Sequence, residues 1–126
     1  MHGYAKLSRG PETFAAVLHT LGVPLPLIAA WVTTAVELIG GSAVLVGAFV
    51  PFVSLPMVVV LLTALFTVHL PYGFFSVKLV EVTASGTKFG TVGYEIILLY
   101  LASLGALVLG GAGPLSVDRW RSNKRK

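Results

Sequence analysis

Residues 26–50 read PLIAAWVTTAVELIGGSAVLVGAFV, and Glu37 is the one charged residue among them. About 20 consecutive apolar residues are enough for a helix to cross the hydrocarbon core of a bilayer. The stretch therefore predicts a membrane-spanning helix. Glu37 lies near the middle of this helix, where a carboxyl group is costly unless it is paired, hydrated or protonated. We interpret Glu37 as a residue retained for function rather than for packing.

Two further apolar stretches follow, at about residues 52–70 and 91–112. Together with the first they predict an all-α transmembrane bundle with three spans, in a single domain of residues 1–126. The composition agrees, because 56% of the residues are hydrophobic and 11% are charged, whereas soluble proteins carry about 25% charged residues. The lipid bilayer is therefore the expected surrounding of most of the chain. Since the sequence has no cysteine, disulfides and thiol catalysis are excluded within it.

The segments outside the spans are more polar. Residues 1–25 form a leader, in which residues 12–21 predict a short amphipathic helix that we place at the membrane interface. Residues 71–90 form a loop, in which residues 77–83 are β-prone and a following Ser-Gly pair signals a turn. The loop therefore predicts a small β-hairpin, on the extracytoplasmic side of the membrane.

Residues 113–126 form a basic tail, which holds five of the nine Lys and Arg residues. Such residues concentrate on the cytoplasmic side, so we expect a multi-pass protein of the plasma (inner) membrane with a cytoplasmic C-terminus. A basic segment directly after an apolar helix is suited to anionic lipid headgroups, and nucleic acid is not an expected partner. The five residues are Arg119, Arg121, Lys124, Arg125 and Lys126.

Lys6, Glu37, His69 and Glu95 form a candidate polar pocket that opens to the outer side of the membrane. The second span ends at His69 on the side where Glu95 begins the third span, and Lys6 precedes the first span on that side. Each residue of the spans also has a purely structural interpretation. Glu37 can link helices through a backbone carbonyl, Glu95 can favour the start of its helix, and His69 can cap a helix end.

Glu37 is expected to be mostly protonated at neutral pH, because a low-dielectric surrounding disfavours the charged form of a carboxyl group. It lies about 16 Å into the first span at the helical rise per residue. The side chain of Lys6 reaches about 6 Å from a backbone that starts outside the span. Lys6 can therefore pair with Glu37 only if the leader folds inward.

Small residues predict which helix faces point into the bundle, because they let two helices approach closely. One set shares a face with Glu37 and the other shares a stripe with Glu95. The sets are Gly40, Gly41 and Gly47, and Ala102, Ala106 and Gly110. No metal site is expected, since the three histidines have no recognisable ligand spacing.

Several short strings together resemble the DoxX family of small bacterial membrane proteins. The strings are HGYAKL at 2–7, GVPLP at 22–26, VELIGGSAVLVGAF at 36–49, TVHLPYGFF at 67–75, GYE at 93–95 and GPLSVD at 113–118. The resemblance implies a four-helix bundle in which the first of these strings follows the first span, so this sequence is expected to begin just after that span. It also implies that Lys6, Glu37, His69 and Glu95 are shared polar positions.

The resemblance implies a link to redox chemistry, since the family name comes from a subunit of an archaeal thiosulfate:quinone oxidoreductase. The chain shows no cysteine, haem-ligation pattern or nucleotide-binding loop. We therefore expect a non-catalytic membrane subunit or anchor that holds a quinone non-covalently and docks a partner oxidoreductase. The alternatives are a small proton-coupled transporter that uses Glu37, or a quinone-reducing oxidoreductase in its own right. A homo-oligomer is also compatible with the sequence.

Overall fold

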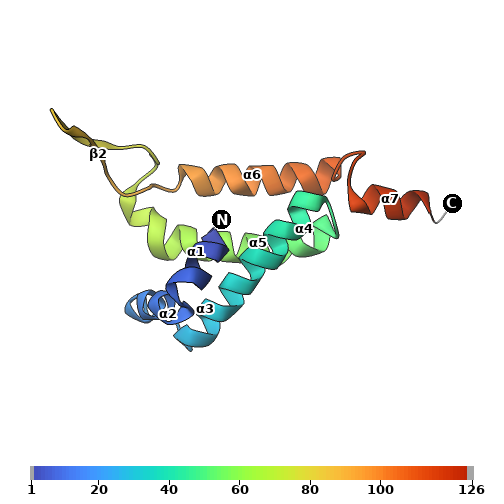
Figure 1. Cartoon of the computed structure of the whole chain (residues 1–126), viewed down its shortest axis with the longest axis horizontal. Helices are drawn as coiled ribbons and strands as arrows, with labels where there is room; N and C mark the ends of the chain where they lie inside the picture. The colour runs from blue at the N-terminus through green and yellow to red at the C-terminus, as the bar shows by residue number, and fades with distance from the viewer. Residues whose placement is uncertain (1, 125–126) are drawn as a thin grey trace.

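The computed structural model describes residues 2–124, which are mostly helical (Figure 1). Met1 and the last two residues of the predicted basic tail, Arg125 and Lys126, lie outside the described residues. In chain order the elements are α1 (His2–Arg9), α2 (Pro11–Thr20), α3 (Pro26–Ala35), η1 (Val36–Gly40), α4 (Gly41–Val46), α5 (Val50–Ala64), η2 (Leu65–His69), η3 (Leu70–Tyr72), β1 (Leu79–Thr83), β2 (Gly86–Phe89), α6 (Glu95–Gly110) and α7 (Val117–Asn123). The first two η segments are π-helical and the third is a 3₁₀ turn.

Two continuous helical segments are long and apolar enough to cross a membrane, Pro26–Val46 with 21 residues and Val50–Tyr72 with 23. The first comprises α3, η1 and α4, and the second comprises α5, η2 and η3. Within the most apolar part of each, only 17% and 11% of the residues are buried inside the protein. An apolar helix in the core of a soluble protein would be buried on all sides. These two segments correspond to the predicted spans at residues 26–50 and 52–70.

The third predicted span corresponds to α6, which has 16 residues. At the helical rise per residue this helix is about 24 Å long. A membrane-spanning helix typically has about 20 residues, so α6 is shorter than a typical span. In Figure 1, α6 runs beside α5 in the opposite direction, and Ile97 and Leu104 of α6 are buried. The helix thus packs on a candidate span, while a third membrane crossing stays a prediction.

The predicted β-hairpin is present. Strands β1 and β2 pair in antiparallel register, with Glu81 opposite Lys88 and Thr83 opposite Gly86. Every residue of both strands is exposed, and the hairpin projects beyond the ends of α5 and α6 (Figure 1). The side of the membrane on which it lies stays a prediction.

The leader contains two helices and packs along the first candidate span. Helix α2 overlaps the helix predicted for residues 12–21, and its Ala15 and Leu18 form a small buried cluster with Ala30 of α3. Helix α1 approaches η1 so closely that a Cβ atom on Gly3 would lie 2.9 Å from Cγ of Leu38. The glycine backbone thus lets α1 reach the middle of this segment, while the interfacial position of the leader stays a prediction.

The turn between the two candidate spans is held by Asp118 of α7. The backbone N–H groups of Phe49 and Val50 donate hydrogen bonds to Oδ1 and Oδ2 of Asp118, at 2.8 and 3.2 Å. The Asp118 N–H in turn donates to the Gly47 carbonyl at 3.0 Å. A carboxylate at a helix N-terminus satisfies donors that have no partner within the helix. Phe49 adopts a left-handed conformation with φ 52°, which these bonds offset.

A loop wraps the start of α6. The N–H groups of Gly93, Tyr94 and Glu95 donate to carbonyl oxygens of residues 73–75, at 3.0–3.1 Å. A side chain on Gly93 would collide with these three carbonyl groups, so only glycine fits here. The first donors of α6 are therefore satisfied without water, as a helix end near the membrane requires.

The small residues differ in their surroundings. A Cβ atom on Gly40 would lie 2.8 Å from Sδ of Met57, and one on Gly47 would collide with Ser116, so both glycines lie at close helix contacts. Gly41 has no neighbour within 4 Å of an added Cβ. The predicted inward stripe of α6 differs from the structure. Its members, Ala102, Ala106 and Gly110, are exposed, because α6 turns larger side chains toward α5.

We expect Asp118→Ala to lower the free energy of unfolding by about 1–2 kcal/mol, the usual cost of a lost helix cap. The substitution leaves the N–H groups of Phe49 and Val50 without their acceptor. Asp118→Asn keeps one acceptor oxygen and should lose less. Denaturant titration in detergent micelles, followed by circular dichroism, measures the difference. Glu81→Ala is the control, because it removes an exposed carboxylate; a stability equal to the parent in Asp118→Ala would contradict this role.

We expect Gly93→Ala to lower the free energy of unfolding by about 1–3 kcal/mol, as overpacking does. The added Cβ atom would force the carbonyl groups of residues 73–75 away from α6. Gly105→Ala is the matched control, since no atom lies within 4 Å of its added Cβ and alanine favours a helix. The same titration compares the two variants. Equal effects of both would show that the close approach at Gly93 is unimportant.

Candidate functional site

The two candidate spans each contain one π-helical turn, and each turn holds one of the predicted site residues. Glu37 lies in η1 of the first span, and His69 ends η2 of the second. A π-helical turn inserts an extra residue into the helix and is often found at functional sites. The irregular backbone therefore coincides with the titratable groups of the apolar segments.

Lys6 and Glu37 form an ion pair. Nζ of Lys6 lies 2.5 Å from Oε1 of Glu37, and each side chain is only about a fifth exposed, 22% and 21%. Nζ also lies 4.1 Å from the centre of the Phe14 ring, so a cation–π contact adds to the pair. Three helical segments, α1, α2 and η1, thus meet at one ammonium group.

The second carboxylate oxygen of Glu37, Oε2, is buried and has no hydrogen-bond partner within the described part of the chain. Buried polar atoms are nearly always satisfied, and one that is not requires an explanation. Oε2 is an acceptor, and the Lys6 ammonium has three hydrogens, of which Glu37 takes one. The pair can therefore accept one hydrogen bond from a small molecule and donate another.

The expected neutral state of Glu37 depended on Lys6 lying outside the span. The structure instead places the ammonium group on the carboxylate, because α1 folds inward. Lys6 and Glu37 are therefore in contact, while the protonation state of Glu37 stays a prediction.

His69 and Glu95 lie at the end of α5 and α6 that carries the hairpin. Nδ1 of His69 lies 2.9 Å from the Val92 carbonyl oxygen. Since a carbonyl can only accept, Nδ1 carries the hydrogen, which in neutral histidine leaves Nε2 as an acceptor. Oε2 of Glu95 accepts a hydrogen bond from the Ser76 N–H at 3.0 Å. Both side chains fasten loop segments to helix ends.

The four predicted pocket residues are therefore found in two groups. Lys6 and Glu37 contact one another in the first candidate span, whereas His69 and Glu95 bind the loops beside α6. Within residues 2–124, no hydrogen bond or ion pair joins the two groups. The same residues contain no gathering of three His, Asp or Glu side chains that could hold a metal ion.

Sequence reasoning missed two residues that organise the ends of the helices. Asp118 holds the turn between the candidate spans, and its signal was available, since it is the one acidic residue in an otherwise basic tail. Ser76 accepts a hydrogen bond from the Ile96 N–H at 3.1 Å and so completes the cap of α6. No pattern in the sequence distinguishes Ser76 from other loop serines.

The chain is similar to a known protein family. The DoxX family model matches residues 1–70, a region that runs from α1 to η3 and includes Lys6, Glu37 and His69. No curated protein and no solved structure matches the chain. The matched region covers more than half of the 126 residues and contains the first candidate span and all but the last two residues of the second. The chain is a membrane protein that belongs to the DoxX family.

Proposed function

We propose that the protein is a non-catalytic membrane subunit that binds the headgroup of a quinone at the Lys6–Glu37 pair. The unpartnered Oε2 of Glu37 is the observation that carries this proposal. It is a buried acceptor in an apolar helix, beside the half-buried ammonium donor of Lys6. Buried polar atoms that lack a partner in the free protein are suited to a ligand that supplies one.

The chemistry of a quinone fits this pair of groups. Quinones are lipid-soluble carriers of two electrons and two protons, with two oxygen atoms on a flat ring. The Lys6 ammonium can donate to one oxygen, and Oε2 of Glu37 can accept from a hydroxyl of the reduced form. Glu37 lies about 16 Å from the start of the span, a depth that a lipid-soluble ligand reaches within the bilayer.

The proposed subunit leaves electron transfer to a partner. The sequence contains no cysteine to ligate a cluster or form a redox disulfide. We therefore assign the redox centre to a partner oxidoreductase, which this protein would anchor at the membrane. The exposed hairpin extends beyond the helices (Figure 1) and is available for that contact.

A small proton-coupled transporter is the second candidate, and the π-helical turn at Glu37 favours it. An irregular helix turn next to an ion pair can rearrange more readily than a regular helix. In this alternative, Lys6 would leave Glu37 when the carboxylate takes up a proton. The two candidates share the same residues but differ in whether solute crosses the membrane.

We propose that the protein lies in the plasma membrane and that its C-terminus is in the cytoplasm. The density of Lys and Arg after α6 supports this orientation. The hairpin would then lie outside the cell.

We expect Glu37→Gln to weaken binding of a short-chain benzoquinol about tenfold or more, because a charge-assisted hydrogen bond is lost. Equilibrium dialysis against the purified full chain in detergent measures the affinity. Glu95→Gln is the control, since it removes a carboxylate at the other end of the molecule. The double substitution Lys6→Gln and Glu37→Gln leaves no unpaired charge; it should fold and also fail to bind. Unchanged quinol affinity in folded Glu37→Gln would refute the site.

Proteoliposomes that contain a pH-sensitive dye distinguish the second candidate. A subunit that only binds quinone gives no proton flux without a partner, whereas a transporter does. Flux that is abolished by Glu37→Gln, together with unchanged quinol affinity, would replace the first proposal by the second.

We expect a cysteine introduced at Ser85 to react with an impermeant thiol reagent added outside intact cells, because the β-turn would be extracytoplasmic. A cysteine introduced at Ser122 should react only after the cells are opened. The chain has no native cysteine to interfere. Labelling of the Ser85 position only after opening would reverse the proposed orientation.

A further inference from the structure

An open hollow of about 450 Å³ lies between the end of α6 and the start of α7. One wall is the glycine-rich segment of residues 110–114, and the other includes Ser116, Arg119 and Ser122. Small-molecule sites have volumes of about 300–1,000 Å³. An added Cβ atom on Gly110, Gly111 or Gly113 would meet nothing within 4 Å, so the glycine wall is open to an approaching group.

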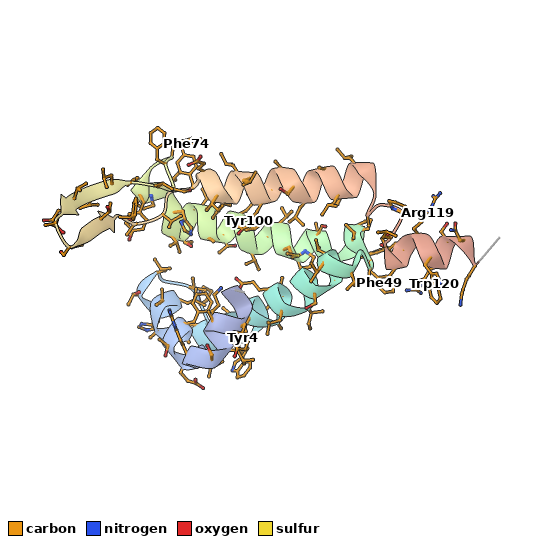
Figure 2. The ribbon with its side chains drawn as sticks, turned by 45° about the horizontal axis from the view of Figure 1, so that its top comes forward. Tyr4, Phe49, Phe74, Tyr100, Arg119 and Trp120 are labelled. Atoms are coloured by element: carbon orange, nitrogen blue, oxygen red, sulfur yellow. The ribbon has the colours of Figure 1, made fainter. Side chains whose placement is uncertain are left out.

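The position of this hollow relative to the membrane follows from Asp118. Its bonds to the turn at Phe49 and Val50 hold α7 at the junction of the two candidate spans. Figure 2 shows Phe49, Arg119 and Trp120 at this end of the molecule. Leu109 and Leu115, on either side of the glycine segment, are 90% and 100% exposed. Apolar side chains and cations thus meet here, as they do at the boundary between acyl chains and headgroups.

The cations of α7, and Lys124 directly after it, differ in their contacts. Arg121 stacks on the Phe49 ring at 4.5 Å, and Lys124 stacks on the Trp120 ring at 3.8 Å. Arg119 lines the hollow and makes no side-chain hydrogen bond, ion pair or ring contact within residues 2–124. Both carboxylate oxygens of Asp118 accept hydrogen bonds from the turn, and within residues 2–124 this acid forms no ion pair with Arg119.

We propose that this hollow binds the phosphate group of an anionic phospholipid. The Arg119 guanidinium, with its planar set of donors, would hold the phosphate oxygens, and the Ser122 hydroxyl would donate a further hydrogen bond. The acyl chains would lie along Leu109 and Leu115. An anionic headgroup is favoured over a zwitterionic one, since residues 110–124 carry three cations and one acid, Asp118. This inference does not depend on quinone binding.

Arg119→Gln and Arg121→Gln make a matched pair for the test, because they change the same charge on the same helix. The full chain is placed in nanodiscs that contain equal amounts of phosphatidylglycerol and phosphatidylcholine, and lipids that stay bound are counted by native mass spectrometry. The parent should retain phosphatidylglycerol over phosphatidylcholine. We expect Arg119→Gln to reduce retention about fivefold or more, because the charge-assisted hydrogen bonds from its guanidinium group to the phosphate are lost. Arg121→Gln should reduce it less than twofold.

Three outcomes would overturn the proposal. Equal losses in the two variants would mean that the total charge of α7 attracts lipid without a site. Equal retention of both lipids by the parent would show that the headgroup charge is not recognised. The third outcome concerns the binding of inorganic phosphate, which is measured by calorimetry with the protein in detergent. If it binds with the affinity of short-chain phosphatidylglycerol and with the same dependence on Arg119, the hollow is a site for free phosphate rather than for a lipid.

Discussion

The hydrocarbon core of a membrane offers no water, so each polar group placed in it or at its edge must find a partner within the protein. This constraint explains the long-range contacts of the chain. Asp118 of α7 satisfies the start of α5 from 68 residues away, and the loop of residues 73–76 satisfies the start of α6. Lys6 of α1 compensates the carboxylate within the first candidate span. Polar contacts therefore fix the helix ends and the leader of this largely apolar chain, beside the apolar packing of α2 on α3 and of α6 on α5.

The Lys6–Glu37 pair couples the leader to the span more strongly than its single contact suggests. Removal of one partner leaves an uncompensated charge at low dielectric, which costs more than the pair itself contributes. Gly3 lets α1 approach, and Phe14 of α2 lies beneath the ammonium group. The same arrangement leaves one oxygen of Glu37 without a partner. The contact that couples the leader to the span and the acceptor atom without a partner thus belong to the same residue, Glu37. For this reason the proposed ligand site lies here.

The two proposed sites lie at different depths and suit different ligands. The ion pair lies near the middle of an apolar segment and offers an acceptor and a donor at short range, as the ring oxygens of a quinone require. The hollow beside α7 lies at the end of the candidate spans and offers an open cation, Arg119, as a phosphate requires. The hairpin, at the opposite end, is fully exposed. The proposed lipid contact and the proposed partner contact therefore lie at opposite ends of the molecule.

The sequence by itself determined the local elements. An apolar run with prolines at its start specifies the span from residue 26, and a β-prone segment before a Ser-Gly turn specifies the hairpin, because both signals lie within a few residues. It also identified Glu37, since a charge in an apolar run is visible without a structure. Only the tertiary structure showed that Lys6 reaches Glu37 and that the stripe of Ala102 and Ala106 faces outward. Both depend on which helix faces meet, and no local pattern encodes how closely two distant backbones can approach.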